Sequence, residues 1–160
     1  MYDVDVADRQ SILALPPDWI AEIVQRTLAE ERVVAAQIVV ALLNDAMIHS
    51  VNRDFLQHDD ATDVISFLYD SEQLEETTGS PGFRGAGLRL EGEIVISTET
   101  AARTALELES SPEREVALYL VHGLLHLCGY DDLTEDERQL MRVRERSILK
   151  LWDLTPHETF

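Results

Sequence analysis

Hydrophobic positions along the chain follow two periods, one typical of strands and one typical of helices. Apolar and polar side chains alternate over residues 2–6, which predicts a short edge strand, and the apolar runs at 37–43 and 93–97 predict buried strands. Residues 64–67 predict a further strand segment. Between the first two strands, apolar residues recur at helical spacing, which predicts an amphipathic helix over about 17–32.

Capping residues predict further helices. The candidate caps are Asn44 or Asp45 for a helix ending near Leu56, Ser97 or Thr98, Ser111 followed by Pro112, and Thr134 for a helix ending near Trp152. Strands and helices alternate early, and three helices then follow in succession. This order predicts an α+β fold, a small and mainly parallel mixed sheet covered by helices, in a single domain over residues 1–160. Residues 69–91, rich in glycine and acidic side chains, predict a long mobile loop.

Composition limits the compartment in which the protein is expected. The single cysteine, Cys128, excludes an internal disulfide and indicates a reducing cytoplasm. The chain does not begin with a basic segment followed by an apolar run, and no apolar stretch reaches membrane-spanning length. We therefore expect neither secretion nor membrane insertion.

The net charge of −18 should repel nucleic acid, because phosphate binding depends on Lys and Arg displacing counterions. No DNA partner is expected, and any RNA contact must rest on a local group of arginines such as Arg53, Arg84, Arg89 and Arg103. More arginines fall in the last predicted helix, where we interpret them as a solvated face: Arg138, Arg142, Arg144 and Arg146.

Two histidines on the helix predicted over residues 112–128 are the first candidates for chemistry. His122 and His126 lie one turn apart, so both imidazoles can reach one metal ion. The rest of this helix is apolar, and unpaired imidazoles would be costly to bury there, whereas a shared cation would satisfy both. Gly129 would end the helix, and the chain would then turn back with Asp131 and Asp132 as candidate oxygen ligands.

A third ligand would complete a zinc site with a position left for water, whose pKa the metal lowers toward neutrality. His122, His126 and Asp132 would supply that set, with Asp131 as a rival ligand and an N-cap role as the alternative for Asp132. The layout resembles that of metzincin-type metalloproteases, which carry a glutamate general base directly after the first histidine. Here that position is Gly123, so peptide hydrolysis by that mechanism lacks its base.

The same segment resembles more closely the signature of the YbeY family of bacterial endoribonucleases, His-Gly-x-x-His-Leu-x-Gly-Tyr-Asp-His. Residues 122–131 fit it, and Asp132 stands where the family has its third histidine. A second family block appears as Asn52, Phe55 and the run Asp-Asp-Ala-Thr-Asp-Val-Ile-Ser-Phe that ends at Phe67. A third, Gly-Asp-Ile-Val-Ile-Ser, appears with glutamate in place of aspartate at 92–97. The blocks follow the family's order.

This resemblance implies a metal-dependent endoribonuclease that prefers single-stranded RNA. Such an enzyme matures the 3′ end of small-subunit ribosomal RNA and takes part in ribosome quality control, with ribosomal RNA and ribosome or ribosome-assembly proteins as partners. One zinc ion is the expected cofactor, although an aspartate ligand is harder than histidine and could admit another divalent metal. Two other functions stay open: a zinc metalloprotease-like hydrolase, and a ribosome-assembly factor with weak or no nuclease activity.

One further departure from the family concerns a cationic group. An arginine that often follows the family's aromatic is replaced by Leu56, and Arg53, on nearly the same helix face, is the predicted substitute. We expect the metal to polarise a scissile phosphate or activate water while Arg53 stabilises the developing negative charge. A surface ion pair of Arg53 with Asp54 or another nearby carboxylate is the alternative.

Overall fold

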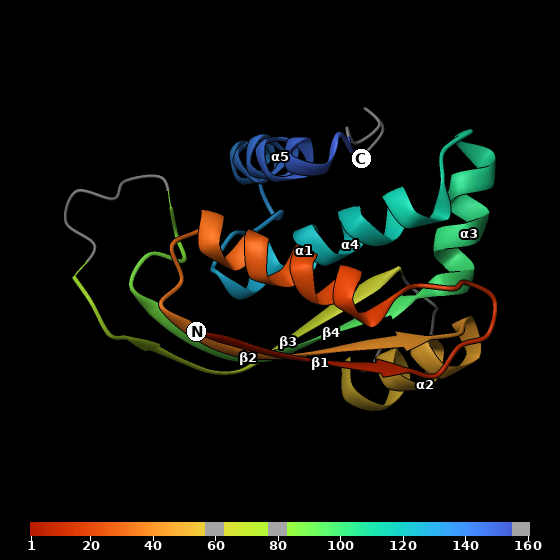
Figure 1. Cartoon of the computed structure of the whole chain (residues 1–160), viewed down its shortest axis with the longest axis horizontal. Coiled ribbons are helices and arrows are strands. Elements are labelled where there is room, and N and C mark those ends of the chain that lie inside the picture. The colour runs from red at the N-terminus through yellow and green to blue at the C-terminus, as the bar shows by residue number, and fades with distance from the viewer. Residues whose placement is uncertain (57–62, 77–82, 155–160) are drawn as a thin grey trace.

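A mixed four-stranded sheet lies at the centre of the computed structural model, which describes residues 1–56, 63–76 and 83–154 (Figure 1). The strands follow the order β1-β2-β4-β3. Three are mutually parallel: β1 (Tyr2–Asp8), β2 (Ala35–Leu43) and β4 (Leu88–Ser97). The other edge strand, β3 (Val64–Gln73), runs antiparallel to β4. This arrangement confirms the predicted α+β fold with a mainly parallel mixed sheet.

The helices cover the two faces of the sheet unequally. They are α1 (Pro17–Glu30), α2 (Asp45–Leu56), α3 (Thr98–Glu107), α4 (Pro112–Leu127) and α5 (Glu135–Leu149), and a 3-10 turn (Lys150–Trp152) follows the last of them. Figure 1 shows α1 and α4 side by side on one face, α5 outside them and α2 on the opposite face. No helix among the described residues is both long and apolar enough to cross a membrane.

Helix α4 is the most enclosed element because the sheet, α1, α3 and α5 all pack against it. Its apolar residues, from Val116 to Leu127, are almost all fully buried. A helix held on every side offers a rigid support, so side chains that project from its C-terminal turns have little freedom to move. The two histidines are on these turns.

The helices begin where their capping residues predict. Ser97, Ser111 and Thr134 each accept a hydrogen bond from the backbone N–H three residues later. Asn44 does the same for Met47 at the start of α2. These side chains satisfy backbone groups that would otherwise lack a partner, which explains why local sequence alone located the helix starts.

The prediction of a long loop over residues 69–91 is wrong at both ends of that range, where the chain forms strands. Strand β3 continues to Gln73 and β4 begins at Leu88, so most of the outer residues pair as a hairpin. Side chains from Leu68 to Gln73 are exposed and mostly polar, so they lack the apolar alternation by which a strand is recognised. Backbone pairing and the salt bridge from Arg89 to Asp70, 2.6 Å long, hold the hairpin instead. Residues 77–82 of the predicted loop lie outside the described residues.

Candidate metal centre

Three side chains from α4 and the turn that follows it converge on one point. The Nε2 atoms of His122 and His126 are 3.2 Å apart, and Asp132 Oδ2 lies 3.7 Å from the first and 3.6 Å from the second. Gly129, with φ of 105°, ends the helix in a backbone conformation that favours glycine and lets the chain return toward the histidines. The structure therefore brings together the three residues predicted as metal ligands.

The other nitrogen of each imidazole ring has a hydrogen-bond acceptor. His122 Nδ1 is 2.6 Å from Oε1 of Glu145, and His126 Nδ1 is 3.1 Å from the backbone oxygen of Tyr130. Both acceptors require a proton on Nδ1, which assigns the lone pair of each neutral ring to Nε2. Two lone pairs and a carboxylate then face one another at close range. Such a donor set fits a divalent cation, and zinc in particular.

Charge around His122 also favours a cation. Burial alone would lower the pKa of His122, but the hydrogen bond and charge of Glu145, together with the charge of Asp132, outweigh it and raise that pKa. Glu145 is only 3 % exposed, so its negative charge is poorly screened by water. The site thus attracts positive charge before any ligand geometry is considered.

The two alternatives for the third ligand have other roles in the structure. Asp131 Oδ1 accepts a hydrogen bond from the backbone N–H of Leu133 at 2.8 Å, which forms a local turn. Thr134, and not Asp132, provides the side-chain cap of α5. Asp132 is thereby left as the carboxylate that faces the two histidines.

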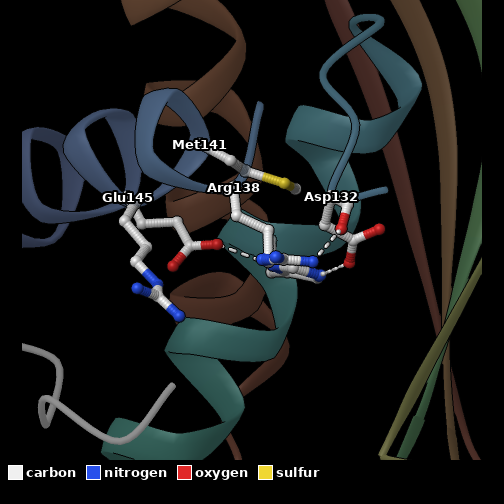
Figure 2. Close-up of a pocket in the computed structure, with 6 residues that line it drawn as sticks. Asp132, Arg138, Met141 and Glu145 are labelled. Carbon is white, nitrogen blue, oxygen red and sulfur yellow. Dashed lines mark hydrogen bonds and ion pairs between the residues drawn. The ribbon is translucent and has the colours of Figure 1, made fainter. Parts of the chain in front are cut away.

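A cavity of about 230 Å³ opens beside the histidines, between α4 and α5 (Figure 2). It is lined by His122, Asp132, Arg138, Met141, Arg142 and Glu145. Figure 2 shows Arg138, Met141 and Glu145 reaching into it from α5 while Asp132 closes it from the turn. The volume exceeds that of several water molecules, so a phosphate group and a water could occupy it together.

This cavity corrects the interpretation of the α5 arginines as a solvated face. Arg138 and Arg142 line the cavity, and Arg144 is largely buried against Glu31, with an Nη2–Oε2 distance of 2.6 Å. Of the four, Arg146 is the exposed one. The signal that was missed is a spacing of three and four residues, which puts Arg138, Arg142 and Glu145 on one helix face toward α4.

The structure does not bring Arg53 to the metal centre. Arg53 lies on α2, across the sheet from α4, where its Nε is 3.2 Å from Oδ1 of Asp54, as the alternative reading of this residue expected. The other members of the expected arginine group are also paired: Arg84 with Glu137, Arg89 with Asp70 and Arg103 with Asp45. These residues form no basic groove beside the histidines.

Polar residues around the buried Glu31 and Tyr130 fix the turn that follows α4. The hydroxyl of Tyr130 donates to Glu31 Oε1 at 2.6 Å, and Arg144 Nε donates to the other oxygen of Glu31 at 2.7 Å. Arg84 Nη1 donates to the carbonyl of Gly129 at 3.0 Å. Because Tyr130 also offers its carbonyl to His126, this cluster sets the orientation of that ring. Sequence analysis assigned no role at the site to Glu31, Tyr130 or Glu145.

Close packing also argues against a protease-type base on α4. A Cβ atom at Gly123 would lie 3.0 Å from Ile94 Cδ1 and 3.1 Å from Ser66 Oγ, because this face of α4 rests on β3 and β4. A larger residue at position 123 would therefore have to displace side chains of the sheet by a few tenths of an ångström. The metalloprotease alternative therefore lacks its base, and the packing at this position disfavours a larger side chain.

The fold and the site together define a class of protein, an α+β protein with a helix-borne histidine pair and a carboxylate, an arrangement typical of metal-dependent hydrolases. Comparison with known proteins then identifies the family. The family described as "Endoribonuclease YbeY" matches residues 6–153, and the chain belongs to it.

Individual relatives agree with this assignment. A Bacillus licheniformis protein named Endoribonuclease YbeY is 34% identical over 157 residues, covering 95% of this chain and 96% of that protein. One of the same name from Rhodopirellula baltica is 43% identical over 114 residues, which is 70% of this chain and 52% of that longer protein. The solution structure of TM1509 from Thermotoga maritima matches with a TM-score of 0.59 at 19% identity, covering 95% and 91% of the two chains, and shares the fold.

Proposed function

We propose that this protein is a metal-dependent endoribonuclease. The observation that carries the proposal is the convergence of His122 Nε2, His126 Nε2 and Asp132 Oδ2 beside an open cavity lined by arginines. The curated relatives bear the name Endoribonuclease YbeY, which supports RNA as the substrate. The packing around Gly123 disfavours a protease.

Each residue of this site has a separate role. A bound zinc ion would supply Lewis-acid chemistry and a water of lowered pKa. Glu145 holds the proton on His122 Nδ1, and the Tyr130 carbonyl holds the one on His126 Nδ1. Asp132 adds one negative charge, which offsets half of the charge of a divalent cation. Residues of α5 form one wall of the cavity that substrate would enter.

The finer parts of the proposal concern substrate and setting. Family resemblance supports single-stranded RNA near the 3′ end of small-subunit ribosomal RNA as the target, with ribosome or ribosome-assembly proteins as partners. Such substrates and the single Cys128 support a cytoplasmic location. Zinc is the proposed metal because imidazole nitrogen with one carboxylate suits it.

Arg53 stays a prediction as the group that stabilises negative charge, since the cavity lining includes no residue from α2. Arg53→Ala tests it against Arg146→Ala, which removes one positive charge from another exposed position. If Arg53 takes part in cleavage, only the first substitution lowers kcat.

The experiment that tests the proposal uses the zinc-loaded protein with single-stranded RNA, structured RNA and casein, each with and without chelator. We expect cleavage of single-stranded RNA alone and its loss with chelator. His126→Ala should abolish both zinc content and cleavage, because it removes one of the two nitrogen ligands. His49→Ala, on α2, is the matched control and should change neither.

The remaining outcomes separate the alternatives. Undiminished RNA cleavage by the metal-free His126→Ala variant would contradict the metal mechanism. Casein cleavage by the wild-type protein would favour the hydrolase of the protease type. Zinc binding without any RNA cleavage would favour an assembly factor that has kept the fold and the metal.

A further inference from the structure

Helix α5 presents two arginines to the cavity beside the metal centre, and nothing in the metal-binding role requires them. We infer that Arg138 and Arg142 form a phosphate-binding pair that holds the RNA backbone next to the metal. This inference rests on the proposed function and deepens it by naming the groups that recognise the substrate.

Arg138 is fixed in place beside the third metal ligand. Its Nη1 donates to the backbone oxygen of Asp132 at 3.2 Å (Figure 2). Its Nη2 donates to Glu135 Oε2 at 2.9 Å. These bonds leave further N–H donors on the guanidinium group. A guanidinium that is already oriented loses little conformational freedom when it binds an anion.

Arg142 lies one turn further along α5 and also lines the cavity. Within residues 1–56, 63–76 and 83–154 it forms no salt bridge. At least one salt bridge is formed by each of Arg53, Arg84, Arg89, Arg103, Arg138 and Arg144. Its charge acts at longer range on Glu135. The residue is half-buried, so its charge is screened less than that of an arginine in open solvent.

The charges around the cavity allow an anion to approach Arg138 and Arg142. The whole chain carries a net charge of −18, and the carboxylates of Asp132 and Glu145 line the cavity. A divalent cation would offset Asp132, and Glu145 is already engaged with His122. Arg138 is paired with Glu135 and adds oriented N–H donors, and Arg142 supplies positive charge that no salt bridge among the described residues offsets.

Geometry suits a phosphodiester chain better than a single small anion. Residues four apart on a helix have Cβ atoms roughly 5–6 Å apart, so the two arginines can contact successive phosphates of one strand. Guanidinium groups bind phosphate oxygens through two parallel N–H donors, which adds direction to the attraction. The pair therefore aligns a single strand along α5, with one phosphate directed at the metal.

The test measures how binding depends on salt. Zinc-loaded protein is titrated against a fluorescein-labelled single-stranded DNA, which carries the same phosphates as RNA, and a gel verifies that the strand stays intact. The slope of log K against log salt is negative, and each lost phosphate contact should reduce its magnitude by about 0.7. Arg142→Gln should show this smaller slope and bind roughly tenfold more weakly at low salt. In the double variant Arg138→Gln/Arg142→Gln, the magnitude of the slope should fall about twice as much.

Controls separate phosphate contact from general effects. Arg146→Gln removes the same charge from an exposed position on α5 and should leave the slope unchanged. Zinc content is measured for every variant, because Arg138 also contacts the backbone of Asp132. Equal slopes for Arg142→Gln, Arg146→Gln and the wild type would overturn the inference. So would a wild-type protein whose binding shows no salt dependence.

Failure here differs from failure of the proposed function. If His126→Ala loses zinc and cleavage while the arginine variants bind and cleave like the wild type, the nuclease proposal stands and the arginine pair does not. If the arginine variants change the slope but the wild type cuts no RNA, the pair stands as a phosphate site and the nuclease proposal fails.

Discussion

Two hydrogen bonds decide which atoms of the histidine pair face a metal ion. Glu145 and the carbonyl of Tyr130 each hold a proton on Nδ1, so both Nε2 atoms carry lone pairs at a separation of 3.2 Å. The histidines and Asp132 could be predicted from a short segment, because helix periodicity and a glycine turn are local. Glu145, 23 residues beyond His122, depends on how α5 packs, which no local pattern contains.

Among single residues, Glu145 allows a quantitative prediction about zinc affinity. Glu145→Ala should lower zinc affinity by about 10-fold to 100-fold, because the partner of a metal-bound histidine raises its basicity and fixes its tautomer. Glu145→Gln keeps an acceptor oxygen without the charge and should cost less. Competition with a zinc-binding dye measures both variants, and circular dichroism verifies that they fold.

The control for this prediction is Asp136→Asn, an exposed carboxylate on the same helix. It removes one negative charge without touching His122 and should leave zinc affinity unchanged. Wild-type affinity in Glu145→Ala would mean that the hydrogen bond to His122 does not tune the metal centre.

At the scale of elements, capping and periodicity located the five α-helices, but the outer half of the hairpin of β3 and β4 was mistaken for a loop. Ser97, Ser111 and Thr134 are local signals, since each satisfies a backbone group three residues away. The outer part of β3 carries exposed polar residues such as Glu72, and its pairing with Arg89 depends on a strand further along the chain. Pairing between distant segments leaves little trace in composition.

Asp45 joins three elements, and its hydrogen bonds predict that the stability of the fold depends on pH. Its carboxylate accepts hydrogen bonds from Ser97 at 2.5 Å and Thr100 at 2.8 Å, and from Arg103 at 2.6 Å, which ties α2 to the end of β4 and to α3. Partial burial alone would raise the pKa of Asp45, but these hydrogen bonds outweigh it and hold that pKa below 3.8.

The sign of the effect follows from this lowered pKa. The stabilisation by the Asp45 carboxylate is complete above the pKa that Asp45 has in the unfolded chain. It is lost as the pH falls through the lower pKa that Asp45 has in the folded protein. Asp45→Asn should therefore reduce the free energy of unfolding by about 1 kcal/mol at neutral pH, allowing for the 27% of the side chain that solvent screens. The gap to the wild type should close in strong acid.

Urea unfolding at a series of pH values measures this gap. Asp3→Asn, an exposed aspartate of β1, is the control and should show no gap at any pH. A difference between Asp45→Asn and the wild type that stays constant down to strong acid would show that the charge of Asp45 is not its source.

At the scale of the whole molecule, an acidic chain places two arginines beside its metal centre. The net charge of −18 predicted poor affinity for RNA away from a local patch, and the structure locates the candidate patch on α5. The residues expected to form it are paired elsewhere, because surface arginines in an acidic protein readily find carboxylates. Which arginines remain available is decided by tertiary packing, so the sequence could predict the need for a patch but not its position.

The position of the metal centre predicts that zinc stabilises the entire fold. Its ligands lie on α4 and the following turn, and α4 packs against the sheet, α1, α3 and α5, so local opening of the site would disturb the whole core. A ligand that binds only the folded state adds about 2.7 kcal/mol at a hundredfold excess over Kd. For a chain of this size that corresponds to a rise in Tm of roughly 5–11 °C. Thermal unfolding with zinc and with chelator measures the shift, which His126→Ala should abolish and His49→Ala should retain. An equal shift in His126→Ala would mean that zinc acts at another site, and the assignment of the three ligands would then fail.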